Sequence, residues 1–225
     1  MMMEENMFPI VMGFHLDVLL MLASGIFYLI CAMSLWKKTK EDGNELVKAI
    51  FAFLIYQAIS MFFMGLEMNT MNMDYGMAYG KIAALSIFIG SAYMLKFPFS
   101  GFSATTRKII FMLSLIASLG IFAWFIQTPE NEMGLTNFVI WYDLIVNGIF
   151  VGGAMILFGL RTPERVFKMK ALGGGSGVVS CCVASNATML LGSVLVSSFF
   201  QFLAPLIILG SLLFITKKNR VNIGE

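Results

Sequence analysis

Residues 60–81 read SMFFMGLEMNTMNMDYGMAYGK and lie between two long apolar stretches. The segment holds a run of methionines, two acidic residues, two tyrosines and Lys81. Apolar stretches of about 18 or more residues on either side predict two membrane-spanning helices that this turn connects. The sequence therefore predicts a helical bundle that presents the turn, and polar residues level with it, at one face of a bilayer.

The composition of the whole chain is that of a membrane protein. Of its 225 residues, 59% are hydrophobic and 12% are charged, whereas a soluble domain carries about 25% charged residues. The charges form short clusters between apolar runs, and no segment outside those runs is long enough to fold alone. We therefore expect residues 1–225 to form one all-α domain in the cell membrane, with the lipid bilayer as its partner.

The apolar runs predict seven transmembrane helices. The predicted spans cover residues 8–36, 48–68, 77–98, 108–127, 136–160, 174–197 and 199–216. The last two divide a run of 46 residues without a charge, 171–216. Both flanks of this run are basic, so it should cross the membrane an even number of times, and about 20 residues per crossing gives a helical hairpin.

Basic residues predict the orientation of the bundle. With seven alternating crossings, every lysine and arginine except Lys81 falls on one side, which the positive-inside rule makes cytoplasmic. The N-terminus is then outside and the C-terminus cytoplasmic. The acidic N-terminus lacks the basic region of a secretory signal peptide, so we expect the first span to be retained.

Several ionisable residues are expected at one depth near the outer face. Ionisable groups inside a span usually face a partner or a water-filled cavity, which favours an outward-facing polar pocket with two aromatic residues in its wall. In the alternative interpretation, Lys81 pairs with one acid and the other acids reach the interface. The predicted ligand-binding residues are Asp17, Glu67, Lys81, Trp141, Tyr142, Asp143 and Asn147.

A methionine stripe accompanies this pocket. Met61, Met64, Met68 and Met71 recur at helical spacing, and thioethers are soft ligands that suit Cu(I). His15 would add an imidazole to such a site. Methionine also fills irregular cores, and packing is the interpretation that a chain with 19 methionines favours. We therefore expect no cofactor, with copper as the alternative.

The residues needed for several kinds of catalysis are missing. One histidine excludes a haem held by two histidines and a zinc site held by three. No nucleophile and base can be paired at matched depth, so we do not expect an enzyme. The cysteines Cys31, Cys181 and Cys182 all fall inside predicted spans, which favours packing over a disulfide or metal site.

The fifth span and the basic loop after it suggest a relationship. The segment FGLRTPERVFKMKALGGGSG, residues 158–177, places a basic loop before a glycine-rich span. In this it resembles the seven-helix sensing domains attached to some bacterial signalling proteins. Residues 1–225 include no kinase or cyclase module, so the resemblance implies output through a separate partner.

Three functions remain open. The first is a receptor or sensor that binds a small ligand in the outer pocket and signals to a membrane or cytoplasmic protein. The second is a transporter of a proton, a cation or copper, although the inner half offers only uncharged polar residues. The third is a structural subunit of a larger membrane complex. We expect no nucleic-acid partner for any of them.

Overall fold

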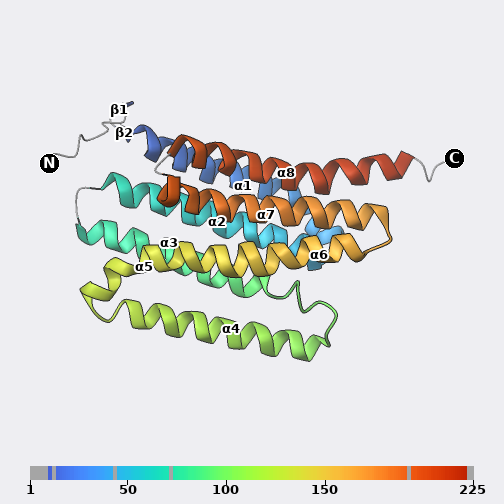
Figure 1. Ribbon diagram of the computed structural model, residues 1–225, viewed down its shortest axis with the longest axis horizontal. Coiled ribbons are helices and arrows are strands. Elements are labelled where there is room, and N and C mark those ends of the chain that lie inside the picture. The colour runs from blue at the N-terminus through green and yellow to red at the C-terminus, as the bar shows by residue number, and fades with distance from the viewer. Residues whose placement is uncertain (1–9, 12–13, 43–44, 71–72, 192–193, 222–225) are drawn as a thin grey trace.

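The computed structural model describes residues 10–11, 14–42, 45–70, 73–191 and 194–221, which are almost entirely helical (Figure 1). The segments α5 (Pro129–Tyr142), η1 (Asp143–Gly152) and α6 (Gly153–Arg161) follow one another without a break and form a single rod, the fifth rod along the chain. The elements are β1 Ile10–Val11, β2 Phe14–His15, α1 Leu16–Asp42, α2 Glu45–Asn69, α3 Met73–Met94, α4 Ala104–Phe125, α5 Pro129–Tyr142, η1 Asp143–Gly152, α6 Gly153–Arg161, α7 Arg165–Leu191 and α8 Val194–Val221.

Five stretches within these rods are long and apolar enough to cross a membrane. They are Val18–Trp36, Glu45–Asn69, Asp74–Met94, Ala104–Phe125 and Gly134–Arg161. Helix α8 contributes a shorter apolar stretch, Phe199–Leu212. The predicted all-helical membrane bundle is confirmed at this level, and the five stretches indicate a multi-pass membrane protein.

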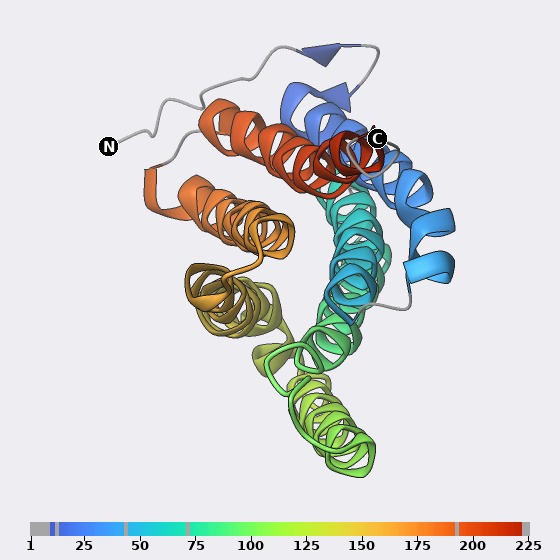
Figure 2. The same cartoon turned by 90° about the vertical axis from the view of Figure 1, so that its right-hand side faces the viewer.

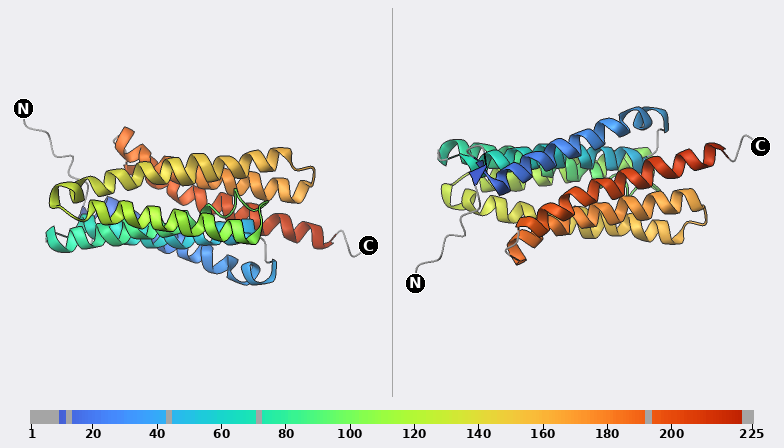
Figure 3. Two further views of the ribbon diagram at one scale, coloured as in Figure 1. Left: turned by 90° about the horizontal axis from the view of Figure 1, so that it is seen from below. Right: turned by 90° about the horizontal axis from the view of Figure 1, so that it is seen from above.

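Rods that follow one another along the chain run in opposite directions, which gives the bundle two distinct ends (Figures 1 and 3). We call the end where α1 begins the N-end and the end where α8 ends the C-end. Helices α2 and α4 finish at the N-end, where α3 and α5 begin. Helices α1, α3 and α6 finish at the C-end. The turn at residues 60–81 therefore belongs to the N-end.

Viewed along the rods, the bundle consists of two facing rows (Figure 2). Helices α1, α2 and α3 form one row that continues to α4, and α8, α7 and the α5–η1–α6 rod form the other. Fully buried side chains such as Tyr28, Phe53, Phe88 and Met155 fill the space between them. Helix α4 stands apart, with 6% of its apolar stretch buried against 56% for α2.

Glycines bring α7 close to its neighbours. A Cβ atom on Gly175 would lie 2.8 Å from the Gly152 carbonyl oxygen, and one on Gly152 would lie 3.2 Å from the Gly175 carbonyl oxygen. Two residues further along α7, and on another side of the helix, a Cβ on Gly177 would lie 3.0 Å from the Ala204 carbonyl oxygen of α8. These contacts explain why α7 is rich in small residues, since close backbone approach is how small residues stabilise helix packing in membranes.

The structure corrects the predicted start of the first helix. Residues 10–15 were expected to be helical, but Ile10 pairs with His15 and Val11 with Phe14 in a short antiparallel ladder. β-branched residues such as Ile10 and Val11 favour extended backbone. Helix α1 begins only at Leu16 and continues beyond the predicted end at residue 36, because the lysines that follow are good helix formers.

The glycine run 173–177 does not start the sixth predicted span. Helix α7 begins at Arg165, so residues 165–170 of the predicted basic loop are helical and the glycine run lies in the helix interior. The helix ends at Leu191 instead of residue 197, and α8 begins at Val194. Glycine normally weakens a helix, but here the neighbouring backbones need the space that a side chain would fill.

Candidate ligand-binding site

A buried polar cluster lies around Asp143, between the two rows of helices. The Gln57 amide nitrogen donates to one carboxyl oxygen over 2.9 Å, and the Asn147 amide nitrogen donates to the other over 2.5 Å. The Asn147 nitrogen also reaches the Ser91 hydroxyl at 2.7 Å. All four side chains are at most 3% exposed. Both oxygens of this carboxyl therefore have a hydrogen-bond donor although it is removed from solvent.

Asp143 is the first residue of η1, a ten-residue π-helix within the fifth rod. At its end, the Gly153 N–H contacts the carbonyl oxygen of Gly148, five residues back. Short π-helical segments are rare and are often found at functional sites. Asn147 follows Asp143 by four residues, so both lie on one side of the rod and Asn147 donates a hydrogen bond to the carboxyl.

A cavity of about 300 Å³ opens beside this cluster. On α2 its lining runs from Gln57, at the middle of the helix, to Glu67 and Met68 near the N-end. Ten helical residues correspond to about 15 Å, so the cavity extends from the N-end to mid-depth. The other lining residues are Met21, Ser60, Met61, Met64, Ile87, Thr136, Ile140, Asp143 and Gln201.

Two carboxyl groups mark the ends of this cavity. Asp143 lies at the deep end, and half-buried Glu67 lies near the N-end with the Thr136 hydroxyl as a hydrogen-bonding partner. Glu67 also packs against α3, because a Cβ on Gly80 would lie 2.7 Å from its carboxyl oxygen. None of the described lining residues is basic. The cavity therefore carries acidic groups without a lysine or arginine to balance them.

The walls between the two acids include four methionines and one buried hydroxyl that has no hydrogen-bond partner among the described residues. Met21 of α1 faces Met61, Met64 and Met68 of α2 around the same space. The Ser60 hydroxyl is buried there and has no hydrogen-bond partner in the described part of the chain. Buried polar groups are almost always paired, so this hydroxyl is available to an occupant of the cavity.

The structure brings only some of the predicted residues together. Glu67 and Asp143 share the cavity, and Asn147 supports Asp143 from one helical turn away. Lys81 and Trp141 do not line it, and Trp141 is exposed on the outside of the bundle. Tyr142 also lies outside the cavity, with its hydroxyl 3.1 Å from the Ser118 hydroxyl and its ring against Phe88.

The remaining predicted residues are only partly described. Asp17 is in the first turn of α1 and His15 is in β2, but their side chains lie outside the described part of the chain. Met71 lies outside the described residues altogether. Met61, Met64 and Met68 all line the cavity. Among the described residues, no group of three His, Cys, Asp or Glu side chains could hold a metal ion.

Sequence reasoning missed four polar residues of the site: Gln57, Ser60, Thr136 and Gln201. For α2 a signal was present, because residues 57, 60, 64 and 67 recur at helical spacing and form one polar and methionine-rich face. Gln201 and Thr136 come from distant parts of the chain. Nothing in their local sequence indicates that α5 and α8 meet α2.

The three cysteines are buried free thiols, as packing residues would be. The Tyr28 hydroxyl donates to the Cys181 sulfur over 2.8 Å, which joins α1 to α7. Cys182 packs against Gly148 and is a further hydrogen-bonding neighbour of Asp143. The thiols therefore form part of the frame that surrounds the polar cluster.

The site combines a buried carboxyl, a second acid near the N-end, walls rich in methionine and a buried hydroxyl without a hydrogen-bond partner among the described residues. Such an arrangement can hold a small molecule that carries a positive charge and an apolar body. Comparisons with protein-family models, with curated proteins and with solved structures find no match to this chain.

Proposed function

We propose that this protein is a receptor-like membrane protein that binds a small cationic ligand in an outward-facing cavity. The observation that carries the proposal is the cavity itself, with Asp143 at mid-depth, Glu67 near the N-end and no basic residue among its described lining. A buried carboxylate inside a membrane needs a partner. An ammonium group would supply the missing charge, and the thioether walls would take an apolar body.

The proposal includes seven crossings with the N-end outside the cell. The charged residues support this orientation, because the C-end carries Lys48, Lys96, Arg107, Arg161 and Arg165, and basic residues favour the cytoplasmic side. With this orientation the cavity opens outward. Its volume is at the lower limit of the roughly 300–1,000 Å³ of typical ligand pockets, which favours a ligand the size of a single-ring amine.

The core beyond the cavity favours binding over transport. Between Asn147 and the C-end, the buried described side chains that separate the two rows are apolar, among them Phe53, Val151 and Met155. Charged species do not cross such a layer without a polar path. Ligand binding would instead change the packing of η1 and α7, which lead to the basic connections at the C-end, where a separate protein would detect the change.

Cu(I) binding is a second candidate, supported by one observation. Met21, Met61, Met64 and Met68 line a single cavity, and thioethers are ligands that select Cu(I). A copper carrier would use these sulfur atoms and leave Asp143 in a supporting role. The two candidates therefore assign the main contacts to different residues of the same space.

A binding experiment separates these candidates. We expect benzylamine, added to the full chain in detergent, to raise the midpoint of thermal unfolding, and its neutral isostere benzyl alcohol to have no such effect. The isosteric Asp143→Asn change should abolish the shift. Asp74→Asn removes an exposed acid at the same end and should leave the shift unchanged.

The copper candidate predicts the opposite dependence. It predicts that Cu(I) stabilises the protein, that this stabilisation survives Asp143→Asn, and that it disappears when Met61→Leu and Met64→Leu are combined. That result would favour Cu(I) over an organic cation as the ligand. Equal shifts with benzylamine and benzyl alcohol would remove the case for a cationic ligand.

A further inference from the structure

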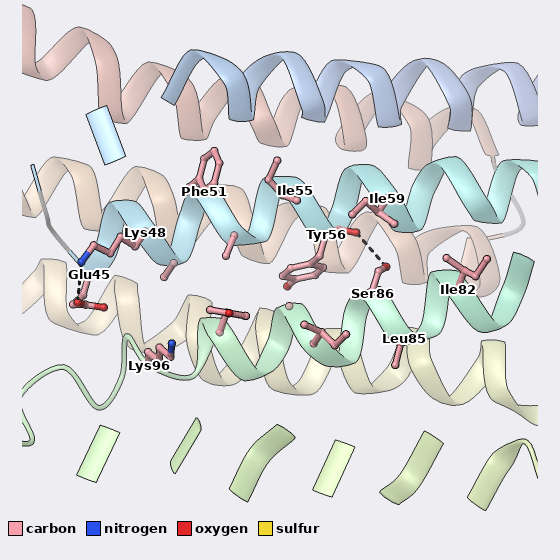
Figure 4. Close-up of a pocket in the computed structure, with 15 residues that line it drawn as sticks. Glu45, Lys48, Phe51, Ile55, Tyr56, Ile59, Ile82, Leu85, Ser86 and Lys96 are labelled. Atoms are coloured by element: carbon pink, nitrogen blue, oxygen red, sulfur yellow. Dashed lines mark hydrogen bonds and ion pairs between the residues drawn. The ribbon is translucent and has the colours of Figure 1, made fainter. Parts of the chain in front are cut away.

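A second and larger hollow lies on the outer side of the row formed by α1, α2 and α3. It is a groove of about 620 Å³ between α2 and α3, shown in Figure 4. Large apolar side chains line most of its length: Phe51, Ile55, Ile59, Ile82, Leu85 and Ile89. It is separate from the ligand cavity, since Tyr56 faces the groove whereas its neighbour Gln57 faces Asp143.

The floor of the groove is formed by Tyr56 of α2, whose ring packs directly against Gly90 of α3. A Cβ on Gly90 would lie 1.7 Å from the Tyr56 ring, so the ring occupies the place of a side chain on α3. The Tyr56 hydroxyl is buried and has no hydrogen-bond partner in the described part of the chain. In Figure 4 the ring leans toward the charged end of the groove. The hydroxyl interacts electrostatically with Asp143 and Cys182, so it lies toward the interior of the bundle, and the Tyr56 ring closes the floor of the groove.

The C-end of the groove is positively charged. The Lys48 ammonium lies 3.3 Å from a carboxyl oxygen of Glu45, and the Arg107 guanidinium lies 3.6 Å from the same oxygen. Lys96 stands over the rings of Tyr93 and Phe111, with its nitrogen 4.4 Å and 4.1 Å from their centroids. Three cations and one carboxylate leave a net charge of about +2 at this place.

The state of Lys96 agrees with an uncompensated positive cluster. Partial burial lowers the pKa of its ammonium group, the charges of Lys48 and Arg107 lower this pKa further, and Glu45 opposes them. Lys96 lies just beyond the apolar stretch of α3, Asp74–Met94, where the headgroup region of a surrounding bilayer would begin. An anion at this point would compensate the cluster.

The length of the groove matches one leaflet of a bilayer. From Lys48 to Ile59, eleven residues of α2 correspond to about 16 Å. Half of the roughly 30 Å hydrocarbon core is about 15 Å. The charged end therefore lies at headgroup depth when the apolar part spans the acyl chains of the leaflet on the C-end side.

We propose that this groove binds an anionic phospholipid, with its phosphate between Lys48 and Lys96 and an acyl chain along α2 and α3. Basic pockets between helices on the cytoplasmic side are sites where anionic headgroups bind. A purely apolar partner helix would leave the positive charge of the groove uncompensated, whereas a phosphate neutralises it. The site requires that the bundle lies in a membrane, and it does not depend on the cationic-ligand cavity.

Native mass spectrometry of the full chain tests this site. Dioleoyl phosphatidylglycerol and dioleoyl phosphatidylcholine have the same chains and differ in net charge, so each is titrated into the protein in detergent. We expect one phosphatidylglycerol to bind at least tenfold more tightly than phosphatidylcholine. Combining Lys48→Gln with Lys96→Gln should lower the affinity for phosphatidylglycerol by about 25-fold, since each lysine near an anionic headgroup raises the affinity by about fivefold.

Two further variants keep the test specific. Arg161→Gln combined with Arg165→Gln removes two exposed charges from the same end of the bundle and should leave phosphatidylglycerol binding within twofold. Ala52→Phe places a ring inside the groove and should weaken both lipids, because it competes with the acyl chain. Circular dichroism establishes that each variant is folded before it is compared.

Three outcomes would overturn the proposal. The first is equal binding of the two lipids by the parent protein. The second is an equal loss in the lysine and arginine variants, which would indicate diffuse attraction to the whole end. The third is a stoichiometric dimer or a co-purified helix that Ala52→Phe removes while lipid binding is unchanged, which would assign the groove to a protein partner.

Discussion

At the scale of single residues, the central feature is a carboxyl group whose two oxygens are both met by amide donors from different helices. Gln57 comes from α2, and Asn147 comes from the same rod as Asp143. Removing one partner of a buried hydrogen bond is costly, because the remaining polar group then has no partner and no water to replace it. Gln57 therefore holds Asp143 in position and links α2 to the fifth rod.

Replacing Gln57 by leucine should destabilise the protein by about 1–3 kcal/mol, because one oxygen of Asp143 loses its donor in a buried place. The free energy of unfolding is measured by titrating dodecyl sulfate into mixed micelles and following circular dichroism. Gln127→Leu, at an exposed position after α4, is the matched control and should change little. Equal losses in the two variants would contradict the structural role of Gln57.

Sequence reasoning at this scale identified acids but not their partners. Glu67 and Asp143 were predicted to share a pocket, and both line one cavity. The basis of the prediction was that an acidic residue within an apolar helix usually faces a partner or a cavity. Lys81 and Trp141 were grouped with them by depth alone. Depth along a helix is readable from the sequence, but the face that a helix turns to its neighbours is set by tertiary packing.

At the scale of helices, glycine positions determine how closely α7 and the fifth rod approach. Gly152 and Gly175 face each other backbone to backbone, whereas a Cβ on Gly153 would meet nothing within 4 Å. Adjacent glycines in one rod thus have opposite environments. The sequence showed that α7 is rich in small residues, but not which of them are in contact, and the π-helical segment η1 had no visible signal.

Gly175→Ala should therefore destabilise the bundle by about 1–3 kcal/mol, since the new methyl group meets backbone atoms that cannot move aside easily. Gly153→Ala should be neutral or slightly stabilising, because alanine is the better helix former and space is available. Both are measured by the same dodecyl sulfate titration. If Gly153→Ala proved the more harmful of the two, the close approach of α7 to η1 would be wrong.

At the scale of the whole molecule, the two ends differ in chemistry. The C-end collects basic residues, while the cavity extends toward the N-end, near which Glu67 lies. The helical character of the chain and the approximate positions of its long apolar helices were predictable, because apolar length and charge clusters follow from the physics of the bilayer. The open arrangement of the two rows and the separation of α4 were not, since they depend on which helix faces pair.

Cysteine labelling tests the orientation of these ends. In intact cells, a membrane-impermeant maleimide should label Asp74→Cys, which is exposed at the N-end, and should label Arg165→Cys only after permeabilisation. The native cysteines are buried free thiols and provide a low background in the parent protein. Labelling of Arg165→Cys in intact cells, with protection of Asp74→Cys, would reverse the proposed orientation.

Helix α4 touches the bundle along one edge and is otherwise surrounded by its environment. Its 22 residues are about 33 Å long, slightly more than the hydrocarbon thickness of an average bilayer. A helix that neighbours do not fix accommodates such a mismatch by tilting. Since Phe111 of α4 forms one of the two rings under Lys96, a thinner or thicker membrane would shift that ring and alter the lipid groove from outside the bundle.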